Sequence, residues 1–204
     1  KKSFNYHGIP EMMWGVNKNL MVHAEGFVSN RNGKLVSEGG AAYAKYRFYS
    51  KDDMYRHFRM AAYSRISTNN AVITQEEIEI NGHNSGYELG FIGTQLLHKV
   101  ALSSSVSFEK AFDNARGNKL PAGFSSNAVN YTFSAGRLML PKEYTNYKQL
   151  NVNLMVELLG QTLGGSGRSF LDIAPSVQFI INSQARIDLA YRKQLFSSMN
   201  RMAP

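Results

Sequence analysis

The sequence has no cysteine among its 204 residues. It therefore forms no disulfide framework, no thiolate metal site and no cysteine nucleophile, which excludes zinc fingers, thioredoxin-like enzymes and papain-like proteases. It also has no apolar run of the roughly 18 to 20 residues that a membrane-spanning helix needs. The longest apolar stretches, such as Leu154 to Leu159, are far shorter, so a helical membrane protein is excluded.

Charged residues are sparse, and most of them are basic. They make up 19% of the chain, and 23 Lys and Arg against 15 Asp and Glu leave a net charge of +8. The basic residues are dispersed rather than clustered on one element, so we expect no nucleic-acid partner. Aromatic residues reach 12%, which is too many for a disordered chain. The length fits one domain, which we expect to span residues 1–204.

Apolar and polar residues alternate through most of the chain, with almost no helical periodicity. Between Gly40 and Tyr49, for example, alanine and aromatic residues occupy the even positions, whereas Lys45 and Arg47 occupy odd ones. A period of two is typical of a strand with one apolar and one polar face. Ten such segments are predicted as strands: 12–16, 20–28, 40–49, 57–66, 87–97, 100–109, 129–134, 150–158, 171–182 and 186–192.

The predicted strands and connections have the proportions of a membrane barrel. Seven of the ten segments are 9 to 12 residues long, whereas about five or six is usual and roughly 9 to 11 cross a bilayer when tilted. The connections are 17–19, 30–38, 51–54, 68–84, 98–99, 114–126, 141–149, 164–169 and 183–184. Short and long alternate through the first six, as in barrels with short turns at one end and longer loops at the other. We predict an all-β, antiparallel, up-and-down transmembrane β-barrel of about 10–12 strands.

A soluble antiparallel barrel is the alternative, because it shows the same alternation with its apolar face turned inward. Strand length, alternating connections and aromatic placement favour the membrane barrel. Large aromatic residues fall near the strand ends, where we expect them to form girdles at the two membrane interfaces. They are Trp14, Phe27, Phe48, Phe58, Tyr87, Phe108, Tyr131, Phe170 and Tyr191. Pro175 lies within a predicted strand, where we expect a bulge or a local break.

The polar faces of the strands carry charged residues that we expect to line the lumen. They are Glu25, Lys45, Arg47, His57, Arg59, Arg65, Glu88, Glu109, Glu157, Asp172, Arg186, Asp188 and Arg192. Such residues can set the selectivity of an open pore, or they can interlock as an ion-pair network that plugs the interior. Arg47, Arg59 and Arg65 lie on neighbouring strands, so we expect them to crowd on one basic wall that favours anionic solutes.

Metal binding and catalysis have weak support in the sequence. His23 and Glu25 share a face, and His57 lies on another strand, but without a third defined ligand we expect hydrogen bonding in the lumen rather than a metal site. Ser103, Ser105 and Ser107 face inward in the predicted barrel while His98 lies in a turn, so no catalytic triad is assembled. The sequence predicts no cofactor and no enzyme.

Five segments of the chain carry a resemblance to a known group. They are GVNKNLMVH (15–23), AKYRFYSKDD (44–53), HFRMAAYSR (57–65), GTQLLHKVALS (93–103) and LDIAPSVQFIINSQARIDLAYR (171–192). In these the chain resembles uncharacterised outer-membrane β-barrel proteins of Bacteroidota, transporter-like in the loose sense used for phenol-pathway porin relatives. The resemblance covers most of the chain. It implies a barrel in the bacterial outer membrane, in contact with lipid and lipopolysaccharide, and brings no settled substrate and no catalytic residues.

The two ends of the sequence depart from that group. KKSFNYHG at the start shows no signal peptide, and QLFSSMNRMAP at the end contains no terminal strand ending in an aromatic residue. We therefore expect that the chain lacks a strand or two of the family's length. Two functions stay open: a passive channel or transporter for small, anionic solutes, or a non-conducting barrel that serves as a scaffold or accessory subunit among other outer-membrane proteins.

Overall fold

The computed structural model describes residues 6–30, 34–141, 149–182 and 185–201, which form one antiparallel, up-and-down sheet of twelve strands. These residues contain no helix that is long and apolar enough to cross a membrane. The strands are β1 (His7–Gly8), β2 (Glu11–Gly15), β3 (Leu20–Ser29), β4 (Val36–Asp53), β5 (Arg56–Asn69), β6 (Gly86–Leu97), β7 (Val100–Ala111), β8 (Asn127–Leu140), β9 (Asn151–Leu163), β10 (Ser169–Ile181), β11 (Ala185–Ala190) and β12 (Lys193–Ser197). The predicted all-β, antiparallel class is confirmed.

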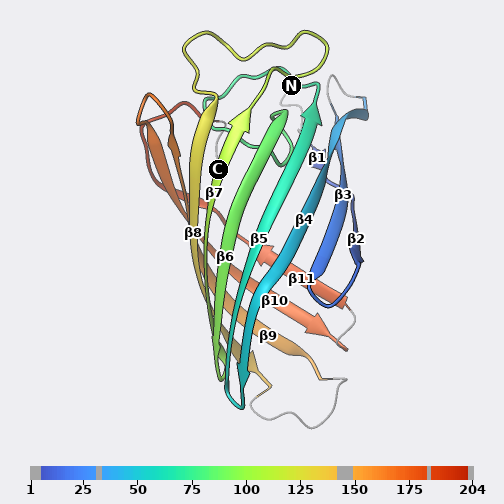
Figure 1. Ribbon diagram of the computed structural model, residues 1–204, viewed down its shortest axis with the longest axis vertical. Helices are drawn as coiled ribbons and strands as arrows, with labels where there is room; N and C mark the ends of the chain where they lie inside the picture. Colours follow the sequence, from blue (N-terminus) through green and yellow to red (C-terminus); the bar gives the residue numbers. More distant parts are fainter. Residues whose placement is uncertain (1–5, 31–33, 142–148, 183–184, 202–204) are drawn as a thin grey trace.

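Eight long strands, β3 to β10, pair in sequence order, and two short strands complete each side of the sheet. β1 and β2 both pair with β3, while β11 and β12 both pair with β10. Among the described residues no pairing joins the first strands to the last, so the sheet is open and its closure into a barrel stays a prediction. The sheet is strongly curved, and β9 to β11 pass behind β4 to β6 in Figure 1.

The break expected at Pro175 falls in the neighbouring strand instead. β10 runs through Pro175, which pairs with Val156 of β9. On its other side, β11 ends at Ala190 and β12 begins at Lys193, and the carbonyl of Pro175 accepts a hydrogen bond from the Tyr191 amide (3.1 Å). Proline has no N–H group, so Pro175 cannot donate a backbone hydrogen bond to the neighbouring strand. The partner strand is therefore interrupted where the ladder bond is missing.

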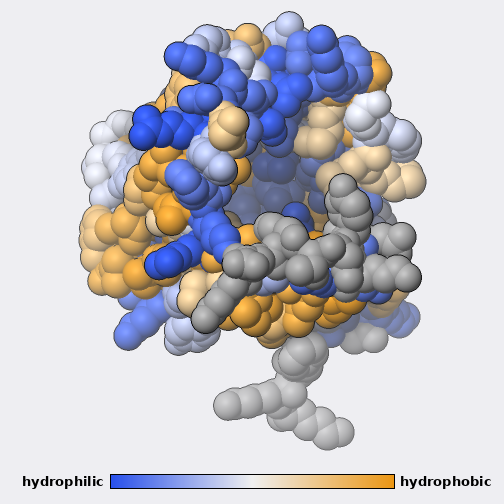
Figure 2. Space-filling view, turned by 90° about the horizontal axis from the view of Figure 1, so that it is seen from below, coloured by the Kyte–Doolittle hydropathy of each residue, from blue (hydrophilic) through white to orange (hydrophobic). Residues whose placement is uncertain are grey.

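The two faces of the curved sheet differ in chemistry. The concave inner face holds buried carboxylates, including Glu25, Glu88 and Asp172. The convex outer face holds large apolar side chains that are exposed: Leu89, Phe91, Val106, Phe108, Val129, Tyr131, Phe133, Leu154, Val156, Ile187 and Leu189. Figure 2 looks into the sheet from one end and shows a hydrophilic hollow, with hydrophobic side chains along the left and lower parts of the outside. Along these strands the arrangement is the reverse of a soluble barrel with an apolar centre.

The connections define two ends of the sheet. The longer connections, including 70–85 and 112–126, lie at what we call the loop end, and 16–19, 54–55 and 98–99 lie at the turn end. Connection 141–150 at the turn end is longer than 164–168 at the loop end, so the alternation weakens toward the C-terminus. Residues 142–148 and the predicted turn 183–184 lie outside the described residues.

The connection from β5 to β6, residues 70–85, folds back into the interior at the loop end, and we call it the inward loop. Its Ile78 and Ile80 are almost fully buried and pack in a small apolar core. The other members of this core come from the inner faces of the strands and from the C-terminal segment: Ala111, Ala128, Leu163, Phe170 and Met199. The sequence analysis predicted a long connection here but not its burial.

Buried polar side chains hold the base of the inward loop. Asn114 donates from Nδ2 to the carbonyls of Ala71 (2.9 Å) and His83 (2.8 Å), and its Oδ1 accepts from the Ser85 amide (2.7 Å). Asn69 donates to the carbonyl of Gly82 (2.6 Å). Buried backbone groups that would otherwise lack partners are satisfied in this way, so the loop has a defined conformation.

Substitutions on the buried and on the exposed side of the inward loop should change the free energy of unfolding by different amounts. Ile80→Ala should lower the free energy of unfolding by about 2–5 kcal/mol, because it leaves a cavity in a fully buried site. Val72→Ala in the same loop should change it by less than about 0.5 kcal/mol, because Val72 is 64% exposed. Urea titration of the refolded protein in detergent micelles measures both. Equal losses would show that Ile80 does not pack in a core.

Candidate functional site

A network of four charged side chains joins the inward loop to the far wall of the interior at the loop end. Asp172 of β10 is fully buried and accepts hydrogen bonds from Arg192 Nε (2.7 Å) and from Arg201 Nη1 (2.9 Å) and Nη2 (2.8 Å). Glu77 of the loop accepts from Arg201 Nε (2.7 Å) and lies 3.5 Å from Arg192 Nη2. We call Glu77, Asp172, Arg192 and Arg201 the loop-end network.

Arg201 is the centre of the loop-end network, and only 3% of its side chain is exposed. Its guanidinium lies 3.5 Å from the ring centroid of Phe170, a cation–π contact. Burial alone would lower the pKa of Arg201, and its hydrogen bonds to Asp172 and Glu77 raise that pKa above its ordinary value. The guanidinium therefore stays charged and paired with two carboxylates.

Further contacts tether the inward loop to the strands around it. Glu76 pairs with Arg168 and accepts from the Asn200 amide (2.8 Å). Gln161 of β9 donates to the carbonyl of Ile78 (2.7 Å) and accepts from the Ile78 amide (3.0 Å). The loop is thus bound to β9, to the β9–β10 connection and to the C-terminal segment, and it narrows the interior at this end.

A second charged group lies nearer the middle of the strands, and we call it the central band. Arg65 of β5 contacts Glu25 Oε1 (3.3 Å) on one side and Glu88 Oε2 (3.2 Å) on the other. Tyr63 donates to Glu88 Oε1 (2.7 Å). Both carboxylates are buried, so water screens the attraction between these charges only weakly, and removal of one partner would leave a buried charge uncompensated.

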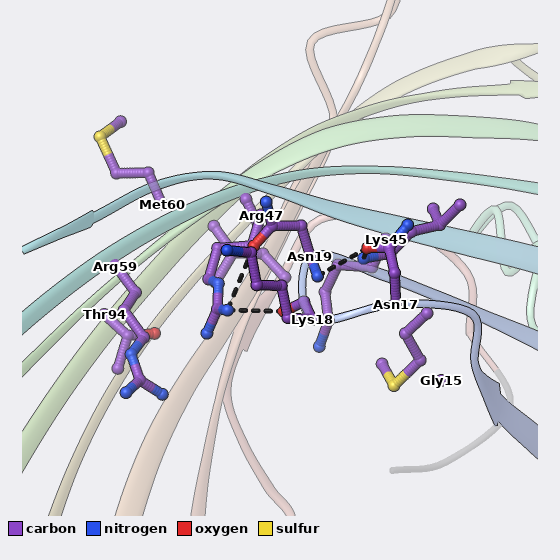
Figure 3. Close-up of a pocket in the computed structure, with 13 residues that line it drawn as sticks. Gly15, Asn17, Lys18, Asn19, Lys45, Arg47, Arg59, Met60 and Thr94 are labelled. Atoms are coloured by element: carbon purple, nitrogen blue, oxygen red, sulfur yellow. Dashed lines mark hydrogen bonds between the residues drawn. The ribbon is translucent and has the colours of Figure 1, made fainter.

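A basic pocket of 490 Å³ lies on the inner face at the turn end (Figure 3). Four of its lining residues are cationic, namely Lys18, Lys45, Arg47 and Arg59, and none is acidic. Arg47 donates to the carbonyl of Lys18 (2.5 Å) and to Asn19 Oδ1 (3.2 Å), while its buried Nε has no partner. Arg59 has a long contact to Asp52 (3.5 Å). Cations with so little compensation favour an anion in the pocket.

The prediction that three arginines form one basic wall is therefore wrong for Arg65. Arg47 and Arg59 do line the same pocket, but Arg65 lies between Glu25 and Glu88. The register pairs Arg47 with Ala61, and Arg65 lies four residues further along the strand, which is roughly 13 Å. Two charged residues on neighbouring strands come together only when they also lie at the same position along the strand axis.

The predicted lumen residues differ widely in exposure. Four are buried, namely Glu25, Glu88, Glu109 and Asp172. Those that are half-buried are Lys45, Arg47, His57, Arg65, Glu157 and Arg192. Arg59 is exposed at the turn end, and Arg186 and Asp188 are exposed on β11, where they pair with each other (2.9 Å). The sequence analysis missed Glu76, Glu77 and Arg201, because nothing in the strand pattern shows that a connection and a tail enter the interior.

Two predicted girdle aromatics lie inside instead. Phe27 is fully buried and Phe170 is 4% exposed. Each is two residues from a buried carboxylate on its own strand, Glu25 and Asp172, and residues two apart share a face. The remaining predicted members are half-buried or exposed: Trp14, Phe48, Phe58, Tyr87, Phe108, Tyr131 and Tyr191. Ring contacts join Tyr87 to Phe108 (6.4 Å) and Tyr49 to Phe58 (5.9 Å).

The interior thus changes along its axis from an apolar and ion-paired loop end, through the central band, to a basic turn end with few compensating contacts. Such an arrangement can attract and hold an anion at the turn end and can restrict passage at the loop end. Comparisons with protein-family models, with curated proteins and with solved structures find no match.

The loop-end network predicts a large and specific loss of stability. Asp172→Asn should lower the free energy of unfolding by about 3–5 kcal/mol, because Arg192 and Arg201 lose their shared carboxylate inside the protein. Asp188→Asn removes the exposed pair with Arg186 and should cost about 0–1 kcal/mol. Both values are measured by urea titration in micelles. A small effect of Asp172→Asn would mean that Asp172 does not organise the network.

Proposed function

We propose that the chain is an integral β-barrel of a bacterial outer membrane that forms a narrow passive pathway for small anionic solutes. The observation that carries this proposal is the orientation of the strands, with large apolar side chains exposed outside and ionisable side chains enclosed. A large apolar side chain gains about 1.5–3 kcal/mol on leaving water completely. A ring of such side chains around the molecule is costly in water and favourable in hydrocarbon.

Strand length supports the membrane setting. β5 to β10 each have 12 to 14 residues, and roughly 9 to 11 cross a bilayer when tilted. Hydrocarbon offers no hydrogen bonds to the backbone, so the proposal requires that the two open edges of the sheet be paired. Lipid and lipopolysaccharide are the proposed partners of the outer face, in line with the group that the sequence resembles.

The pathway in this proposal runs through the enclosed polar space. Two cavities lie toward the turn end, the basic pocket of 490 Å³ and a second of 540 Å³ lined by residues that include Ser134, Asn153 and Gln178. The basic side chains of the first favour anions. The inward loop narrows the loop end, so it acts as the constriction that a solute must pass.

A second function, a non-conducting barrel that serves as a scaffold or accessory subunit, is favoured by one specific observation. The inward loop, its apolar core and the loop-end network fill the interior at the loop end with satisfied contacts. A barrel filled in this way can be rigid and closed. In this case the outer face and the loops would bind other outer-membrane proteins.

Electrical measurement in planar bilayers separates the two functions and tests the role of the basic pocket. The reconstituted chain should conduct with a preference for anions. The double variant Lys45→Gln with Arg47→Gln should lower the anion-to-cation permeability ratio, because it removes two cations from the pathway. Lys110→Gln is the control, since Lys110 pairs with Tyr87 on the outer face. No conductance in any salt would contradict the channel and favour the scaffold.

Weakening the contacts that hold the inward loop should change the conductance. Glu77→Gln removes the carboxylate that binds Arg192 and Arg201, which weakens the attachment of the loop by about 3–5 kcal/mol. Single-channel conductance should rise because the loop leaves the interior more often. Asp113→Asn is the control, since Asp113 is an exposed carboxylate of the connection 112–126 and accepts a hydrogen bond from the Leu120 amide (2.9 Å). A conductance unchanged in Glu77→Gln would mean that the loop does not restrict the pathway.

A further inference from the structure

Three potential metal ligands meet on the inner face where β2 pairs with β3. Glu11 of β2 lies directly opposite Glu25 of β3, and His23 is two residues from Glu25. One oxygen of each carboxylate and one nitrogen of the imidazole lie within 4.8 Å of one another. The Glu11 carboxylate is in direct contact with His23 Nδ1. The sequence analysis identified His23 and Glu25 and lacked this third ligand, which the strand register supplies.

Unpartnered buried atoms at the same place are an independent observation. Glu25 Oε2 has no hydrogen-bond partner, and only 4% of the Glu25 side chain is exposed. His23 Nε2 is also buried without a partner. Leaving a buried polar atom unpaired costs about 1–3 kcal/mol, and more when it is charged. Such atoms are rare in folded proteins, and the Glu25 oxygen beside a shared set of donors indicates a ligand that satisfies it.

The charged side chains at and beside this site have a net charge that one divalent cation would neutralise. Glu11, Glu25 and Glu88 contribute three negative charges, and Arg65, which contacts Glu25 and Glu88, contributes one positive charge. The balance is two negative charges. Arg65 bonds to Glu25 Oε1 and leaves Oε2 without a partner, which is how outer partners orient a metal ligand. Glu11 is 36% exposed at its side chain, so an ion can reach the site from solvent.

We propose that Glu11, His23 and Glu25 bind one divalent cation of the zinc class. An imidazole nitrogen with two carboxylates suits Zn²⁺ and similar ions, whereas Mg²⁺ and Ca²⁺ take oxygen ligands alone. Zinc at about 2.0–2.2 Å from each ligand atom needs those atoms roughly 3.4 Å apart. The half-exposed Glu11, which is in contact with His23, can take up this spacing by rotating its side chain. Three protein ligands leave a further position for water.

This inference is independent of the proposed function, because its site uses neither the basic pocket nor the loop-end network. The site would be present in a conducting barrel and in a silent scaffold. Zinc binding and conductance are therefore separate measurements, and the failure of one leaves the other unaffected.

Equilibrium dialysis of the full chain in detergent micelles against Zn²⁺, after removal of metal with a chelator, tests the proposal. One Zn²⁺ per chain is expected. His23→Gln and Glu11→Gln should each weaken binding at least tenfold, since each removes a ligand. Glu11→Gln matters most, because this half-exposed residue can be changed with little risk to folding, which circular dichroism checks. Co²⁺ in place of Zn²⁺ should give visible absorption bands that both variants lose.

His57→Gln is the matched control. His57 Nδ1 also contacts a carboxylate, Asp52 (2.8 Å), but no third ligand joins them in the part of the chain that the structure describes. The expected result is unchanged Zn²⁺ binding in this variant. No binding to the unmodified chain, binding that survives both His23→Gln and Glu11→Gln, or an equal loss in His57→Gln would each overturn the proposal.

Discussion

The structure depends on one constraint: apolar side chains lie on the outer face and ionisable side chains on the inner face of a sheet that curves around them. A curved sheet with this polarity cannot build its whole interior from an apolar core. Each inward charge must find a partner or keep its water, because an unpaired buried charge is costly. The ion pairs, the inward loop and the basic pocket are three different outcomes of that requirement.

The loop end and the turn end meet the requirement in different ways. At the loop end, Asp172 and Glu77 neutralise Arg192 and Arg201, and the inward loop contributes apolar side chains that exclude water. At the turn end, Lys45 and Arg47 have no carboxylate in salt-bridge range within the described chain and face an open pocket. The interior is therefore compensated at one end and positive at the other, which is the basis for the proposed preference for anions.

The same contacts that favour a channel constriction also favour a plug. Buried ion pairs contribute less to stability than their number suggests, because removing two charges from water offsets much of their attraction. A loop held by such ion pairs can have a defined position and still leave it when one of the charged residues is substituted. The distinction between a conduit and a scaffold therefore depends on how often the inward loop leaves the interior, which is a property of its tethers rather than of the strand pattern.

Much of the fold follows from local pattern, and much of the site does not. The alternation of apolar and polar residues predicted where the long strands lie, because successive residues of a strand point to opposite faces of the sheet. The same rule, applied strictly, would have placed Phe27 with Glu25 and Phe170 with Asp172 on the inner face, where they lie. Arg201 and Glu77 meet only after the loop and the tail fold inward, and Glu11 joins His23 through register. Tertiary contacts of this kind leave no periodic signal in one sequence.

Spin labels on β7 test most directly which face meets hydrocarbon. The chain has no cysteine, so a cysteine introduced at one position carries the only label. In lipid bilayers, labels at positions 106 and 108 on the outer face should collide with dissolved oxygen and be protected from a water-soluble nickel complex. Labels at positions 103 and 105 on the inner face should show the opposite. Free access of the nickel complex to positions 106 and 108 would contradict the account.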